Sequence, residues 1–162
     1  MTTGKLILPE LDDEMARTRA ILVVVPKEHL DWEPGEGLHS IGWNANHLAE
    51  IVGWTQPILN EDDFDIAPVG GTPYETPSLD DPAEILAAFD ANLKAARDSI
   101  ASASDELMAK DWSMSMGGQT LFTMSKGDCI RKWVLNHSVH HRGILSVYLR
   151  MRGVEFTPVY DG

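Results

Sequence analysis

The sequence predicts an all-α protein built as a four-helix bundle. Apolar residues recur at helical spacing in four long segments, and residues that favour helix starts accompany these segments. At 162 residues with 43% hydrophobic side chains, the chain has the size of one domain with one core. We therefore expect residues 1–162 to form a single domain of four packed helices.

The first two helices are expected on either side of a turn-rich segment. Pro9 suits a first helical turn, acidic residues follow it, and Pro26 is expected to end the helix. Ser40 can cap a second helix that runs to about Ile58. The segment Asn60 to Pro77 is acidic, carries two glycines and three prolines, and is expected to form a long loop.

The third and fourth helices also have recognisable starts. Asp81 is followed by a proline and then by a glutamate at the third helical position, which is a helix-start pattern. Between residues 111 and 124, tryptophan and methionine alternate with polar residues before two glycines, which predicts a short extended excursion or hairpin. Ser125 can cap the last helix, whose apolar pattern runs from Ile130 to Met151, and Gly153 stands where a helix stop belongs.

Charge and composition exclude several classes of partner. The formal net charge of −12 is not interrupted by a basic cluster, so nucleic acid and anionic membrane surfaces should be repelled. No apolar run reaches the roughly 20 residues that span a bilayer, and Met1 to Lys5 lacks the layout of a signal peptide. We expect a cytoplasmic protein that binds neither nucleic acid nor membrane.

Histidines lie on the apolar faces of the second and fourth predicted helices. On a helical wheel with Ile130 at zero, His137 lies about 20° to one side, His141 about 20° to the other, and His140 about 80° away. Two imidazoles one turn apart are thus expected in the middle of an apolar stripe. His47 lies on a similar stripe of the second helix.

These three histidines are candidate metal ligands. Buried imidazoles without partners would be unfavourable, whereas imidazoles at positions i and i+4 can bind one ion together. Cys129 is the only cysteine, so a thiolate-rich site is excluded and nitrogen or oxygen must hold any metal. The alternative is that His47, His137 and His141 are core residues hydrogen-bonded to carbonyl groups, and the pattern alone leaves both interpretations open.

Other side chains have weaker claims to a role. Glu50, one turn after His47, could orient a ligand or act as a base, but we expect it to face solvent. Arg142 is expected to form an ion pair within its helix or across a dimer interface, and Cys129 to be a buried, inert thiol. Three tryptophans could wall a pocket, although helical spacing makes core packing the default expectation: Trp43, Trp54 and Trp133.

Several sequence motifs resemble those of the DinB/YfiT-like family. The motifs are Asn46–Glu50 (NHLAE), His137–Gly143 (HSVHHRG), and Tyr148–Arg150 (YLR) followed by a glycine. The segment from Val25 to Pro34 is similar to the family's first inter-helix turn, and the tail Thr157–Tyr160 to its ending. The resemblance covers most of the chain, and the histidine spacing is its most specific part.

The resemblance implies an up-down-down-up four-helix bundle, often assembled as a homodimer. It implies one divalent metal ion per chain, zinc first and nickel second, with His47, His137 and His141 as the ligands. Characterised members of the family include metal-dependent S-transferases and an isomerase that use low-molecular-weight thiols. A homodimer would also cover apolar side chains near the helix ends, such as Trp54, Leu59 and Phe64.

Two functions of different classes follow. The first is a metal-dependent enzyme of the thiol S-transferase or isomerase kind, or a hydrolase, acting on a small molecule, with Asn60–Pro77 and the methionine-rich segment shaping its pocket. The second is a non-catalytic metal-binding or structural dimer module. Three histidine ligands leave coordination positions open, which favours the enzyme. No clear general acid, general base or anion clamp is visible beyond Glu50, which favours the module.

Overall fold

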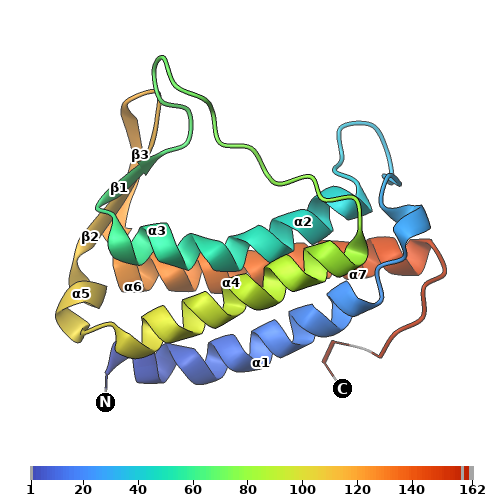
Figure 1. The fold of residues 1–162 in the computed structure, drawn as a ribbon, viewed down its shortest axis with the longest axis horizontal. Helices are drawn as coiled ribbons and strands as arrows, with labels where there is room; N and C mark the ends of the chain where they lie inside the picture. Colours follow the sequence, from blue (N-terminus) through green and yellow to red (C-terminus); the bar gives the residue numbers. More distant parts are fainter. Residues whose placement is uncertain (1, 158, 161–162) are drawn as a thin grey trace.

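The computed structural model describes residues 2–157, 159 and 160, and these residues form a four-helix bundle with a small sheet at one end (Figure 1). The α-helices are α1 (Thr3–Val23), α2 (Ile41–Ile51), α3 (Thr55–Asn60), α4 (Pro82–Ser102), α5 (Asp105–Ala109), α6 (Lys126–Cys129) and α7 (His137–Met151). Short 3-10 helices lie at Lys27–His29 and Val52–Trp54, and a π-helix at Ile130–Asn136 joins α6 to α7. Pro158, which belongs to the family-like tail, and Met1 lie outside the described residues.

The four long helices have an up-down-down-up arrangement. In Figure 1, α2 and α4 run in one direction, and α1 and α7 run in the opposite direction. Each of α1 and α2 packs against both α4 and α7. Because the second and third helices of the bundle run in parallel, the chain between them has to return along the whole bundle, and it does so across one face.

The sheet has three strands: β1 (Asp63–Asp65), β2 (Asp111–Met116) and β3 (Gln119–Ser125). The predicted hairpin is confirmed: β2 and β3 are antiparallel, and both turn glycines have positive φ angles. β1 pairs with β2 in parallel, within the segment that was expected to be a loop. The Asp65 carboxylate holds β1 against the turn, because it accepts hydrogen bonds from the backbone N–H groups of Gly117 (3.0 Å) and Gly118 (2.7 Å).

The helix starts at three predicted caps are confirmed. The Ser40 hydroxyl accepts from Trp43 N, the Asp81 carboxylate accepts from Ala83 N, and the Ser125 hydroxyl accepts from Asp128 N.

The predicted start of the first helix is wrong. α1 begins at Thr3 with Thr2 as its cap, so Pro9 lies inside the helix. A proline there removes one backbone hydrogen bond, and the turn before it buries Ile7 and lets Gly4 approach the Ile100 carbonyl closely.

The buried face of the last helix differs in part from the prediction. Of the apolar residues expected on it, Ile130, Val134 and Leu145 are buried, whereas Ile144 and Tyr148 are half-buried. Ser138, Arg142 and Leu149 are also buried. The π-helix that precedes α7 advances fewer degrees per residue than an α-helix, so the face is rotated relative to Ile130. The last helix packs into the apolar core as expected, but the row of side chains that faces the core is shifted toward Leu149.

Within the described residues, no helix is both long and apolar enough to cross a membrane.

Candidate metal centre

The three candidate histidines come together between α2 and α7. The ring centroid of His47 lies 5.1 Å from that of His137 and 4.5 Å from that of His141, and the two α7 rings are 4.7 Å apart. One nitrogen from each ring can be chosen so that all three lie within 4.8 Å of one another. His140 is exposed, as expected for a residue at the rim. His137 and His141 are half-buried at the edge of the core, and the expectation of a central position is wrong because of the π-helix.

Glu50 fixes the orientation of His47. The Nδ1 atom of His47 lies 2.5 Å from a carboxylate oxygen of Glu50, so the imidazole carries its proton on Nδ1 and leaves the lone pair of Nε2 free. The expectation that Glu50 faces solvent is wrong, because its side chain is only 6% exposed. A carboxylate behind a histidine is a common arrangement in metal sites, where it orients the ring and makes it a better ligand.

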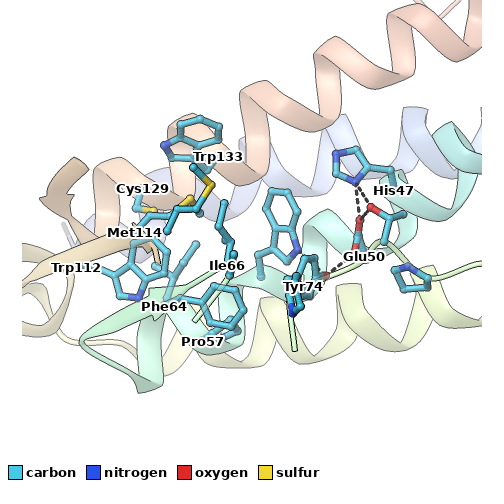
Figure 2. Close-up of a pocket in the computed structure, with 18 of the residues that line it drawn as sticks. His47, Glu50, Pro57, Phe64, Ile66, Tyr74, Trp112, Met114, Cys129 and Trp133 are labelled. Atoms are coloured by element: carbon cyan, nitrogen blue, oxygen red, sulfur yellow. Dashed lines mark hydrogen bonds and ion pairs between the residues drawn. The ribbon is translucent and has the colours of Figure 1, made fainter. Parts of the chain in front are cut away.

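The segment that crosses the bundle supplies the other partners of Glu50 (Figure 2). Thr76 donates a hydrogen bond of 2.7 Å to the carboxylate oxygen that faces His47, and the Tyr74 hydroxyl donates to the other oxygen. Trp54 Nε1 in turn donates to the Tyr74 oxygen over 3.2 Å. Desolvation, followed by the hydrogen bond to Glu50, raises the pKa of Tyr74 to about 12, so the hydroxyl keeps its proton at neutral pH.

Asn44 performs the same function for His141. The Nδ2 atom of Asn44 donates to the Ser40 carbonyl over 2.8 Å, which leaves its Oδ1 to accept from Nδ1 of His141 over 3.1 Å. The Nδ1 atom of His137 faces the Trp133 backbone without a hydrogen bond of good geometry. With both protons on Nδ1, the Nε2 atoms of His137 and His141 face each other at 3.0 Å.

These nitrogens are suited to a metal ion. Desolvation, together with the neighbouring His47, lowers the pKa of His137 to about 4 and that of His141 to about 3, so both rings are neutral at pH 7. Neutral imidazole is the form that binds metals. Nitrogens around a tetrahedral zinc ion are about 3.3 Å apart, which is close to the separation of the two α7 nitrogens.

A large cavity of about 780 Å³ adjoins His47. In Figure 2, His47 and Glu50 lie at one end, and apolar and sulfur-containing side chains lie at the other. The crossing segment and the methionine-rich strand both contribute to it, as expected. Its apolar walls include Trp54, Phe64, Ile66, Trp112, Met114 and Trp133.

The aromatic side chains near the helix ends therefore face inward. Trp54 and Trp133 wall the cavity instead of filling the core, while Trp43 stacks between His39 and His47. Leu59 is buried, and Phe64 lines the cavity, so these side chains do not require a second protomer to cover them.

Arg142 and Cys129 also have defined surroundings. Arg142 is buried and forms an ion pair of 2.5 Å with Glu14 of α1, so the prediction of an intrahelical or intersubunit pair is wrong. Arg142 also donates a hydrogen bond to the Tyr160 hydroxyl, so it connects both α7 and the C-terminal tail to α1 beside the histidines. Cys129 is buried and lines the cavity, and burial raises the pKa of its thiol to about 12, as expected of an inert cysteine.

Sequence reasoning missed three residues that position the histidines: Asn44, Tyr74 and Thr76. Asn44 precedes His47 by one helical turn, so the shared helix face was an available signal. Tyr74 and Thr76 lie in an irregular segment, and the sequence carries no sign of the glutamate that they contact.

Several solved structures have the same fold. A DinB-like protein from Bacillus cereus ATCC 10987 is 21% identical, with a TM-score of 0.69 over 94% of this chain and 95% of its own. The DinB-like protein YjoA from Bacillus subtilis is 16% identical, with a TM-score of 0.69 over 94% of this chain and 96% of its own. YfiT from Bacillus subtilis, described as "a probable metal-dependent hydrolase with an unusual four-helix bundle topology", is 16% identical, with a TM-score of 0.69 over 94% and 89%.

Comparison with curated protein sequences gave no match. The sequence profile of the DinB superfamily matches residues 10–145, which include all three histidines and most of the bundle. This chain belongs to the DinB superfamily.

Proposed function

We propose that the protein binds one divalent metal ion through His47, His137 and His141 and acts as a metal-dependent enzyme on a small molecule. The observation that carries the proposal is the 3.0 Å approach of two imidazole Nε2 atoms. Without a cation, one of these rings has to move its proton to Nε2 and leave a buried Nδ1 lone pair without a donor. A metal ion removes this conflict because all three rings can keep their protons on Nδ1.

The donor set suits a catalytic ion. Three histidines leave at least one position open, and imidazole nitrogen suits several divalent metals, zinc and nickel among them. The family resemblance places zinc first and nickel second. When bound, such an ion supplies Lewis acidity and lowers the pKa of a water or thiol that joins it. The chain's own residues set the histidine tautomers through Glu50 and Asn44, and aromatic side chains form one wall of the cavity beside His47.

For the reaction, we propose a thiol S-transferase or isomerase with a low-molecular-weight thiol as co-substrate. Glu50 is already bonded to His47, Tyr74 and Thr76, and no other carboxylate is found among the described residues that line the cavity. A thiol ionises more readily than water, so it needs less help from a protein base. The alternatives are hydrolysis, as in the description of YfiT, and a non-catalytic metal-binding or structural module.

Metal analysis tests the ligand set. Elemental mass spectrometry of protein purified without a histidine tag should find about one divalent ion per chain. Single alanine substitutions of His47, His137 and His141 should each lower the occupancy sharply. The control variants His140→Ala and His39→Ala should retain the metal, and an equal loss from His140→Ala would contradict the proposed set.

Two assays separate the alternatives for the reaction. Zinc-loaded wild type and His137→Ala are compared for thioether formation from cysteine and 1-chloro-2,4-dinitrobenzene, and for cleavage of p-nitrophenyl butyrate. Faster thioether formation by the wild type supports the transferase. Faster ester cleavage alone supports the hydrolase, and equal rates in both assays support the non-catalytic module.

A further inference from the structure

We infer that the cavity beside His47 receives an uncharged apolar group of the substrate, such as an alkyl chain or a neutral aromatic ring, while the polar reacting group lies at His47. The inference rests on the proposed function, because it places the reacting group at the proposed metal. It adds the chemical class of the substrate, which the histidines alone do not define.

The polarity of the cavity changes along its length. His47, Glu50, Tyr74 and Thr76 lie at one end, and they are the residues joined by hydrogen bonds around the carboxylate. The opposite end is formed by aromatic and sulfur-containing side chains (Figure 2). A molecule that extends from His47 into this space therefore leaves water for an apolar environment.

The lining offers no partner to an anionic group. Among the described residues that line the cavity there is no lysine or arginine, and Glu50 is the only aspartate or glutamate. At the apolar end of the cavity, away from the proposed metal, a carboxylate or phosphate would lose its hydration without gaining an ion pair, and the net charge of −12 adds repulsion. Glu50 is also unsuited to a cation, because its oxygens already accept hydrogen bonds from three groups.

Strand β2 is built to present apolar side chains to this space. Trp112, Met114 and Met116 line the cavity, whereas the alternate residues Ser113 and Ser115 do not. Methionine is flexible and polarisable, so it adapts to ligands of different shapes. The methionine-rich strand β2 therefore forms a wall of the cavity that favours an apolar group.

Four hydroxamates that share one metal-binding head test the inference. Acetohydroxamate, hexanohydroxamate, adipic monohydroxamate and 6-aminohexanohydroxamate are titrated into the cobalt-loaded wild type, and the cobalt absorption bands report the dissociation constants. The dissociation constant of hexanohydroxamate should be at least about tenfold lower than that of acetohydroxamate, because its additional methylene groups enter the cavity. The two charged analogues should bind no more tightly than acetohydroxamate. Equal binding of all four, or binding of either charged analogue as tightly as hexanohydroxamate, would overturn the inference.

Matched lysine variants locate the effect. In Met114→Lys the advantage of hexanohydroxamate should fall to about threefold or less, and adipic monohydroxamate should gain affinity. Ser115→Lys places the same charge one residue further along, away from the cavity, and should behave as wild type. If Met114→Lys does not fold, Met116→Lys replaces it, because Met116 is half exposed at the rim. If Met114→Lys and Ser115→Lys bind the four hydroxamates with the same affinities, the alkyl group of the ligand does not lie beside Met114.

A second readout separates this inference from the proposed function. Nile red, an uncharged dye, reports apolar sites by its emission and needs no metal. In metal-free wild type its emission should rise, and Met114→Lys, but not Ser115→Lys, should suppress the rise. If cobalt does not bind to the histidines but Nile red behaves in this way, the metal proposal fails and the apolar cavity stands. If cobalt binds and the dye result is absent, the cavity inference fails alone.

Discussion

Replacing Glu50 by glutamine tests whether this residue positions a metal ligand. The carboxylate accepts from His47 Nδ1 at 2.5 Å, from Thr76 at 2.7 Å, and from Tyr74. A glutamine has one oxygen, so its NH₂ group cannot accept the third hydrogen bond, and the contact with His47 loses its charge assistance. A charge-assisted hydrogen bond contributes about 1.5–3 kcal/mol and a neutral one about 1 kcal/mol. A loss of about 1.4 kcal/mol corresponds to zinc binding that is about tenfold weaker.

The assay is competition for zinc with a coloured chelator at about pH 7.5. Tyr74→Phe is the matched control, because it removes one donor and keeps the negative charge, so it should weaken zinc binding by about threefold or less. Wild-type zinc affinity in Glu50→Gln would refute the positioning role. Unchanged affinity with lost turnover would instead assign Glu50 as a general base.

Four further predictions concern stability and assembly. Burial lowers the pKa of His137 from 6.5 to about 4 and that of His141 to about 3, so the unfolded chain binds protons first as pH falls. The metal-free protein should therefore lose about 2.7 kcal/mol of unfolding free energy from about pH 7.5 to 5.5 in urea titrations. A variant with glutamine at both positions should lose less. Arg142→Met should lower the free energy of unfolding by about 2–4 kcal/mol, because it leaves the Glu14 carboxylate without its ion-pair partner. The double variant with Glu14→Gln should regain part of this free energy. If chemical denaturation shows no recovery, the ion pair does not stabilise the fold. Lys126→Met should lower stability by about 2 kcal/mol, because the buried ammonium binds carbonyl groups at the end of α3, and an unchanged melting temperature would contradict that. Light scattering should give twice the chain mass of 17.9 kDa for the homodimer predicted from the family resemblance, and the single-chain mass would contradict it.

Features that depend on neighbouring residues could be predicted from the sequence. Ser40, Asp81 and Ser125 cap helices through groups two or three residues ahead, so each start signal is complete in the local sequence. The pair His137 and His141 was also predictable, because both lie in one regular helix and keep their mutual spacing whatever precedes it.

Features that depend on accumulated geometry or on distant contacts could not be predicted. The rotation of α7 arises in the π-helix at residues 130–136, and apolar periodicity does not distinguish π from α turns over one such segment. Tyr74 and Thr76 reach Glu50 across 24 and 26 residues of chain, and only the folded path of that chain brings them together. The three-residue strand β1 is too short for an alternating pattern to be recognised.

The parallel arrangement of α2 and α4 has a consequence for how this architecture can change over evolutionary time. α4 has 21 residues and is about 30 Å long, so roughly ten extended residues would be enough to return along it. The chain has 21 residues between Asn60 and Pro82, and the residues beyond the required length, here called the surplus, form β1 and one wall of the cavity. Mutations, insertions and deletions in this surplus can remodel the cavity while the helices and their histidines stay in place. A single scaffold can in this way diversify its ligands without having to evolve a new fold.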